Sequence, residues 1–150
     1  MTWKPSVTVA AVIERDGRFL LVEERDQDEG DPVFNQPAGH WEPEETLVQA
    51  CAREVLEESA HRFDPQQLVG IYRWSRPQRD VTYLRFAFCG EILGFEQARA
   101  LDEGILRAVW LTPDEIRALA PRLRSPLVWR CVEDYMDGKR YPLELITHFA

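Results

Sequence analysis

Cysteine and histidine are scarce in this sequence, and neither forms a cross-linking or metal-binding pattern. There are three cysteines, an odd number without a C-x-x-C pair, and three histidines without ligand spacing. A disulfide framework and a zinc site are therefore not expected, and free thiols in a reducing compartment are.

Long apolar runs and an excess of basic residues are also missing. No run approaches the roughly 18 apolar residues that span a membrane, and residues 1–5 lack the apolar region of a signal peptide. The net charge is −8, whereas proteins that bind nucleic-acid polymers or anionic membranes present a basic surface. We therefore expect a cytoplasmic protein that binds neither.

The sequence does contain enough apolar residues for a folded core. Of its 150 residues, 45% are hydrophobic, which fits one domain over residues 1–150. Hydrophobic periodicity and capping signals predict the elements. The expected strands are 7–14, 19–24, 67–74, 81–93 and 106–111, and the expected helices are 46–59, one from 113 to near 119, and one that Ser125-Pro126 opens and Gly138 closes. This order predicts an α/β fold with a mixed sheet and helices on both faces.

Three further segments carry local signals. Asp16-Gly17 between the first two strands is typical of a hairpin turn. Residues 25–36 form an acidic stretch that we interpret as a mobile or functional loop because of its length. The tail, residues 141–150, is apolar enough to pack onto the body.

The helix expected over residues 46–59 places acidic side chains where apolar ones belong. At about 100° per residue, Cys51 and Val55 lie in an arc that should face the core, and Glu54, Glu57 and Glu58 lie on or at the edge of that arc. Glu54 and Glu58 are one turn apart, so they point the same way. Unpaired carboxylates there would resist burial, and a hard cation such as Mg²⁺ would remove the penalty. An ordinary surface helix with Glu–Arg ion pairs is the alternative.

Together with the residues before it, this helix resembles the Nudix box, the signature of the Nudix hydrolase superfamily, over residues 39–61. The matching positions are Gly39, Glu45, Arg53, Glu54, Val55, Glu57 and Glu58. Two positions depart, because Ala60 replaces the closing glycine and His61 replaces the aliphatic residue after it. Glycine normally supplies a left-handed turn there, which alanine adopts at modest cost.

A closer resemblance, to the NudJ phosphatase subgroup, extends over nearly the whole chain. Its distinctive parts are the run Asn-Gln-Pro-Ala-Gly-His at 35–40 and two Pro-Leu motifs at 126–127 and 142–143. This resemblance implies an α/β/α sandwich and dependence on Mg²⁺, for which Mn²⁺ substitutes. It also implies hydrolysis of nucleoside di- and triphosphates, hydroxymethylpyrimidine diphosphate and thiamine diphosphate, with release of orthophosphate.

The resemblance also implies roles for residues of the box. Glu54 and Glu58 would ligate the metal, Glu57 would contribute directly or through water, and the Gly39 carbonyl would complete the protein ligands. Arg53 would pair with a neighbouring carboxylate and hold it in place, although an ordinary surface ion pair is the alternative.

Outside the ligand set, the general base stays open between Glu57 and Glu103, which lies in the acidic loop before the last strand. For Glu103, a solvated loop carboxylate is an equal alternative. We assign Glu45 a structural role near the positive end of the helix dipole.

Several aromatic and basic residues are candidates for binding the organic group and the terminal phosphate. The preferred candidates are Trp74, Trp41, Tyr83 and Arg85, with Tyr72 and Arg73 as further possibilities. Aromatic rings stack on flat ligands, and arginine binds phosphate through two parallel hydrogen bonds. Core packing for the rings and a surface charge for the arginines are the alternatives.

Three functions remain open at this point, all with a small phosphorylated molecule as ligand. The first is the NudJ-like phosphatase. The second is a housecleaning nucleoside triphosphate pyrophosphatase, and the third is a catalytically silent domain that senses a nucleotide. The intact Arg53-Glu54 and Glu57-Glu58 pairs disfavour the third. A monomer and a homodimer are both compatible with the sequence.

Overall fold

The computed structural model of the chain describes residues 2–25 and 30–149. Its strands form two sheets, one with the order β5-β1-β7-β6-β9 and one in which β3 pairs with β2, β4 and β8. Only the β1–β7 pair is parallel among the strand pairs of the described residues, so the first sheet is mixed. The strands are β1 (Ser6–Ala11), β2 (Glu14–Arg15), β3 (Arg18–Arg25), β4 (Pro32–Asn35), β5 (Ala38–His40), β6 (His61–Arg76), β7 (Val81–Phe95), β8 (Ile105–Leu111) and β9 (Tyr141–Pro142).

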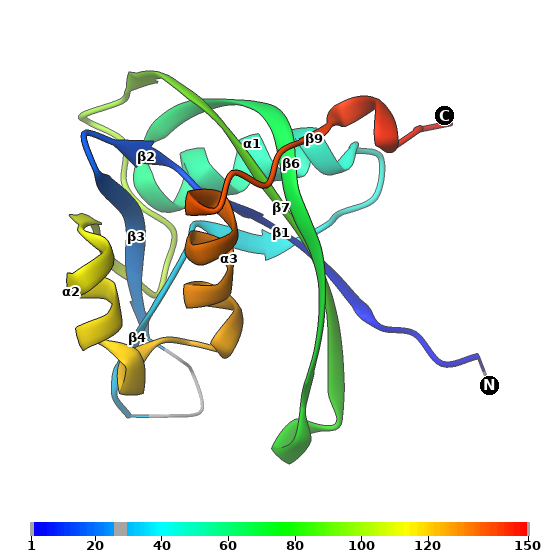
Figure 1. Cartoon of the computed structure of the whole chain (residues 1–150), viewed down its shortest axis with the longest axis horizontal. Coiled ribbons are helices and arrows are strands. Elements are labelled where there is room, and N and C mark those ends of the chain that lie inside the picture. The colour runs from blue at the N-terminus through cyan, green and yellow to red at the C-terminus, as the bar shows by residue number, and fades with distance from the viewer. Residues whose placement is uncertain (1, 26–29, 150) are drawn as a thin grey trace.

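Helices cover both faces of these sheets, with α2 and α3 on one side and α1 on the other (Figure 1). The helices are α1 (Leu47–Ser59), α2 (Pro113–Ala118) and α3 (Pro126–Met136), with short 3₁₀ turns at η1 (Pro77–Arg79), η2 (Ala120–Arg122) and η3 (Leu143–Leu145). This is the expected α/β/α sandwich.

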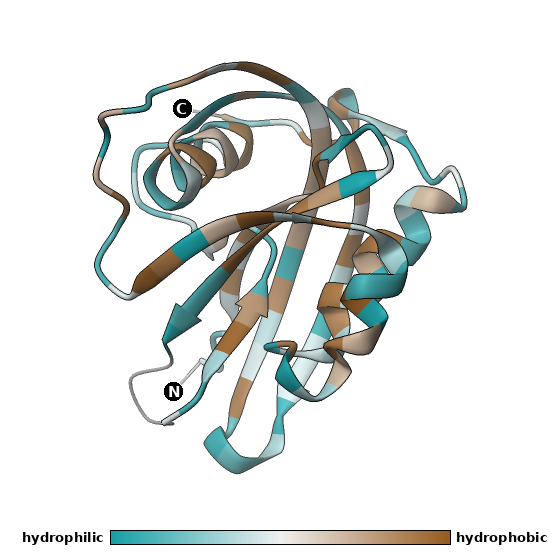
Figure 2. Ribbon diagram, turned by 90° about the vertical axis from the view of Figure 1, so that its left-hand side faces the viewer, coloured by the Kyte–Doolittle hydropathy of each residue, from teal (hydrophilic) through white to brown (hydrophobic). Residues whose placement is uncertain are grey.

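Two apolar cores separate the layers, because successive strand residues point to opposite faces. Val69 of β6 packs with α2 and α3, whereas Leu68 packs with α1. Leu21 and Leu20 of β3 divide in the same way. Figure 2 shows apolar colours along the strands between the helices and hydrophilic colours at the tip of the β6–β7 hairpin.

Local signals in the sequence are confirmed at the turns and caps. Asp16 and Gly17 both have positive φ, as the predicted tight hairpin turn requires. Thr46 caps α1 in a capping box with Gln49, so the helix begins where expected. Ala60 adopts the left-handed conformation at φ 60°, in the place of the family's glycine.

Several expected boundaries were wrong because strand pairing decided them. The supposed loop 25–36 contains β4, a short segment that pairs with β3; residues 26–29 lie outside the described residues. Strand β5, which is not among the expected strands, precedes α1 and pairs with β1. Strand β6 begins at His61 rather than at 67, because register shifts in its pairing with β7 accommodate Asp64-Pro65.

The tail packs as expected. Strand β9 pairs with β6, and Leu143 and Ile146 pack against the core on the α1 side. In the part of the chain that the structure describes, no helix is long and apolar enough to cross a membrane.

Candidate active site

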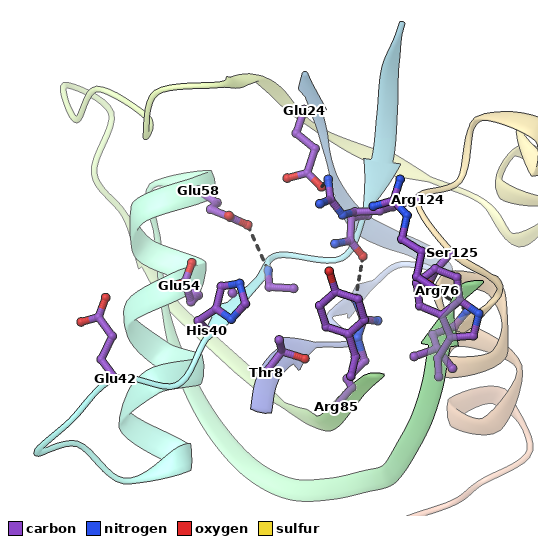
Figure 3. Close-up of a pocket in the computed structure, with 16 residues that line it drawn as sticks. Thr8, Glu24, His40, Glu42, Glu54, Glu58, Arg76, Arg85, Arg124 and Ser125 are labelled. Carbon is purple, nitrogen blue, oxygen red and sulfur yellow. Dashed lines mark hydrogen bonds and ion pairs between the residues drawn. The ribbon is translucent and has the colours of Figure 1, made fainter. Parts of the chain in front are cut away.

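A cavity of about 370 Å³ lies between α1, the centre of the first sheet and the start of α3. Figure 3 shows Glu54 and Glu58 of α1 on one side of it and Arg76, Arg124 and Ser125 on the other. Its lining residues are Thr8, Glu24, Asn35, Ala38, Gly39, His40, Glu42, Glu54, Glu58, Trp74, Arg76, Tyr83, Arg85, Arg124, Ser125 and Leu127. The cavity therefore has an acidic wall opposite a basic one.

The acidic wall consists of two buried carboxylates from successive turns of α1. Glu54 and Glu58 are only 9% and 8% exposed, which confirms their inward placement on the helix. The Glu54 carboxylate lies against Gly39, where a Cβ atom would come within 2.2 Å of it. A Glu58 carboxylate oxygen accepts a hydrogen bond of 3.0 Å from the Ala38 N–H. Strand β5 thus brings the start of the box against its helix.

Burial makes both carboxylates poor acids in the absence of a cation. Loss of water raises the pKa of Glu54 to about 7, against the opposing effect of Arg53. Loss of water raises the pKa of Glu58 to about 9, and the negative charges of Glu24, Glu54 and Asp102 add to this rise. Among the described residues, no cationic side chain pairs with Glu58. The acidic wall is therefore short of positive charge.

Arg53 connects the acidic residues of the box. It forms two hydrogen bonds with Glu45, at 2.8 and 3.0 Å, and donates to Glu54 at 2.8 Å and to Glu57 at 2.9 Å. The pKa of Glu45 is lowered mainly by this contact with Arg53. Glu45 precedes the N-cap Thr46, so it acts on α1 through Arg53 rather than as a first-turn residue. The Arg53 network holds Glu57 near Glu54, although Glu57 itself does not line the cavity.

Two acidic residues near this wall were missed by sequence reasoning. Glu24 lies in the cavity, where Arg124 donates to it at 3.1 Å, and burial raises its pKa despite that contact. The alternation of side chains along β3 could have predicted this position. Leu20 lies four residues before Glu24 and faces α1, so Glu24 is expected on the same face of the strand. Asp102 is the second, since its N–H donates to the Glu57 carbonyl and its charge acts on Glu58.

Arg85 is a buried cation whose partners are uncharged. It is 6% exposed and donates to the side-chain oxygens of Asn35 and Gln36, at 2.8 Å each. Gln36 is anchored in turn to the Val128 carbonyl of α3. No carboxylate pairs with Arg85 within residues 2–25 and 30–149. Glu24 of the same cavity acts on Arg85 only at longer range. The guanidinium of Arg85 is therefore held in place without a direct ion pair, which suits an anionic ligand in the cavity.

The aromatic candidates separate into residues inside and outside the cavity. Trp74 and Tyr83 line it, half-buried, with their rings stacked at 5.9 Å and 15°. Tyr72 instead packs with the α2–α3 core and donates to Asp134. Trp41 is 45% exposed and lies beside the C-terminal segment in a separate hollow. Arg73 is exposed and does not line the cavity. Arg76, three residues further along β6, does line it.

Glu103 is exposed on the loop before β8 and does not line the cavity. Its neighbour Asp102 is the loop residue that contacts α1. The proposed role of Glu103 as a base therefore stays a prediction.

The donor set suits a hard cation, although it does not form a closed metal site. Among the described residues, no three acidic, histidine or cysteine side chains are arranged as a metal-binding group. Two buried carboxylates and the adjacent Gly39 leave positions for water or substrate oxygens, as Mg²⁺ sites do. The unbalanced charge of Glu58 and the space that Gly39 leaves for Glu54 both fit such an ion.

Comparison with known proteins identifies the class. The NUDIX domain family model matches residues 2–130, and the chain belongs to this family. It is a Nudix hydrolase, which cleaves pyrophosphate bonds in small phosphorylated substrates, and hydrolases of this family generally use divalent metals.

Individual relatives sharpen this assignment. The chain is 42% identical to phosphatase NudJ of Escherichia coli O1:K1 / APEC over 147 residues, covering 98% of this chain and 94% of that protein. A NUDIX hydrolase from Nitrosomonas europaea is 53% identical with a TM-score of 0.95, covering 97% and 98% of the two chains. The E. coli ORF135 protein is 26% identical with a TM-score of 0.72, covering 89% and 90%. The resemblance to the NudJ subgroup is thus confirmed.

Proposed function

We propose that the protein is a Mg²⁺-dependent phosphatase of small heteroaromatic diphosphates and of nucleoside di- and triphosphates. The observation that carries this proposal is the pair of buried carboxylates Glu54 and Glu58, facing a cavity that also contains Arg85, which forms no direct ion pair among the described residues. A cation on the acidic wall and a phosphate between it and Arg85 would balance both charges.

The residues in and around the cavity have separate tasks in this proposal. Glu54, Glu58 and the Gly39 carbonyl would hold Mg²⁺ or Mn²⁺, with Glu57 contributing directly or through water. When bound, such an ion would supply positive charge that lowers the pKa of water and offsets phosphate charge. Arg53 positions Glu54 and Glu57, which it contacts at 2.8 and 2.9 Å. Glu57 or Glu103 completes proton removal from the attacking water.

Recognition of the substrate falls to the sheet side of the cavity. Arg85 binds a phosphate oxygen, and Trp74 and Tyr83 provide an aromatic surface for the ring. Stacking tolerates different rings because every flat ring has a π-face. This supports activity on hydroxymethylpyrimidine diphosphate and thiamine diphosphate as well as on nucleotides. The similarity to phosphatase NudJ supports orthophosphate as the product.

The product distinguishes this function from the pyrophosphatase alternative. The purified protein is incubated with each nucleoside triphosphate, thiamine diphosphate and hydroxymethylpyrimidine diphosphate, with Mg²⁺ or with excess chelator. Orthophosphate and pyrophosphate are then measured separately. We expect orthophosphate from both diphosphates and no turnover in chelator.

Other outcomes would overturn parts of the proposal. Pyrophosphate from nucleoside triphosphates alone would support the housecleaning enzyme. Saturable nucleotide binding without any turnover would support the silent sensor, and full turnover in chelator would remove the metal from the proposal.

A further inference from the structure

A second cavity, of about 690 Å³, lies beyond the last turn of α1. It is bounded by the start of β6, the end of β7, strand β8 and the loop that precedes β8. None of its lining residues lines the first cavity. The catalytic proposal therefore leaves this cavity unused.

The walls of this second cavity are aromatic. The His61 ring lies 4.8 Å from the ring of Phe95 and 5.8 Å from that of Trp110, in an edge-on arrangement with the latter. The guanidinium carbon of Arg15 lies 4.2 Å from the centre of the Trp110 ring. Phe95 is itself 57% exposed, so an apolar surface is left open to a ligand.

The charged residues of this cavity are all positive. Arg15, Arg99 and Arg107 line it, and no aspartate or glutamate of the described chain does. Arg99 and Arg107 have carboxylate partners at 3.4 and 2.7 Å. Arg15 forms no ion pair among the described residues, and its guanidinium lies over the Trp110 ring. In a chain of net charge −8, a hollow with this charge selects an anion.

His61 adds a directional acceptor. It is 7% exposed, and its Nδ1 lies 2.9 Å from the Ser59 carbonyl oxygen, so Nδ1 carries the proton and donates it. Nε2 has no hydrogen-bond partner among the described residues. Every fully buried polar side-chain atom of those residues has a hydrogen-bond partner. Because Nε2 has none, it is not fully buried, and we place it at the surface of the cavity that His61 lines. Burial lowers the pKa of His61, which keeps Nε2 unprotonated at neutral pH.

We infer that the second cavity binds a flat heteroaromatic ring that carries a phosphate group. An N–H of the ring or of its exocyclic amino group, such as the amino group of adenine, donates to His61 Nε2, the ring packs on Phe95 and Trp110, and the phosphate lies on Arg15. A ligand of this class satisfies the open acceptor, the apolar wall and the excess positive charge together. An inorganic anion would satisfy only the last of these, and an apolar segment of a second copy only the second.

The test uses ¹⁵N-labelled protein with AMP as the probe, in chelator so that no metal bridges AMP to the acidic wall. Amide chemical shifts are followed at Ala60, Phe95 and Ala108 for the second cavity and at Gly39 for the first. We expect saturable shifts in the second set at AMP concentrations below about 10 mM, the weak end of specific affinity. Adenosine, which has the ring without the phosphate, should bind at least about tenfold more weakly.

Variants assign the binding to named groups. Arg15→Gln should weaken AMP binding about tenfold, whereas Arg117→Gln, a matched arginine 5.3 Å above the Trp129 ring elsewhere, should not change it. His61→Phe keeps an aromatic ring and removes the acceptor, so it should weaken AMP and adenosine alike. If His61→Phe does not fold, Arg15→Gln still decides, because Arg15 is exposed.

Four outcomes would overturn the inference. These are the absence of saturable shifts, shifts confined to the first cavity, equal binding of AMP and adenosine, and shifts that depend on protein concentration without AMP. The last would show that a second copy covers this surface.

Discussion

The two cavities lie on either side of the last turn of α1, and neighbouring residues serve them: Glu58 lines the first, and Ser59 and Ala60 line the second. The first opposes buried carboxylates to arginines, so it needs a cation before it can accept a phosphate. No carboxylate of the described residues lines the second, and its Arg15 forms no ion pair among those residues, so an anion needs no added cation there. The net charge of the whole chain therefore does not predict the local charge of either cavity, because the fold places acidic and basic residues in different parts of the molecule.

The substitution Glu58→Gln should have the largest effect, because it removes a buried carboxylate that distinguishes the first cavity from the second. This change should lower turnover at least about a hundredfold, because losing part of the charge that stabilises a transition state costs about 3–4 kcal/mol. Glu54→Gln should behave likewise, whereas the exposed Glu91→Gln should be neutral. Initial rates in Mg²⁺ and circular dichroism measure activity and folding. Normal rates with a lowered melting temperature would favour a structural role for the pair.

The next largest effect separates the two candidate bases. Glu57→Gln should lower kcat by about a hundredfold, within the range for general-base catalysis, because Arg53 holds Glu57 beside Glu54. Glu103→Gln should change kcat by less than about threefold, in line with an exposed loop residue. Profiles of kcat against pH for both variants provide the measurement. The reverse ranking would assign the base to the loop before β8.

Trp74→Ala tests the aromatic side of the first cavity. It should raise KM for pyrimidine diphosphates and purine nucleotides by roughly fivefold to a hundredfold, the equivalent of about 1–3 kcal/mol of stacking. If Trp74 stabilises ground and transition states equally, kcat should barely change. Because the ring is half-buried, the stability loss should stay below the about 3–5 kcal/mol of a core tryptophan. A large stability loss with normal KM would move the search for the stacking residue to Tyr83.

Titration of the metal-free protein measures the charge imbalance of the first cavity. The pKa values of Glu54 and Glu58 are raised to about 7 and about 9, so the folded state keeps protons that the unfolded chain has lost. Stability contributed by these protons is complete below pH 4.5 and is lost as pH rises through 7 and 9. Melting temperature in chelator should therefore fall over this window, and Glu58→Gln should reduce the fall. His61 also has a shifted pKa, and its contribution is the same in the variant and the parent, so it cancels in the comparison. Equal slopes of melting temperature against pH in the two proteins would contradict the prediction.

The smallest effect concerns Ala60, at the junction of the two cavities. Its left-handed conformation costs roughly 1–2 kcal/mol, whereas glycine adopts it freely at an entropic cost of about 0.5–1 kcal/mol. Ala60→Gly should therefore raise the free energy of unfolding by about 0–1.5 kcal/mol without changing turnover. Urea unfolding measures the difference, and a loss of stability would show that the Ala60 methyl group matters more than its backbone.

The sequence by itself determined the features that depend on neighbours along the chain. The Asp16-Gly17 turn, the Thr46 cap and the inward direction of Glu54 and Glu58 follow from local φ preferences and from the helical repeat. A strong local pattern needs no knowledge of distant strands, and the family assignment rests on the same spacing.

Only the tertiary structure decided what gathers around those residues. The pairing of β3, β4 and β8 placed Glu24 and Asn35 in the first cavity, and the centre of the sheet buried Arg85 between amide oxygens. Trp41, which belongs to the box in sequence, lies outside the cavity, whereas Trp74 lies in it. The second cavity joins β2 to the end of β7, which are far apart in the chain. Strand register and layer packing set such neighbours, and no local repeat encodes them.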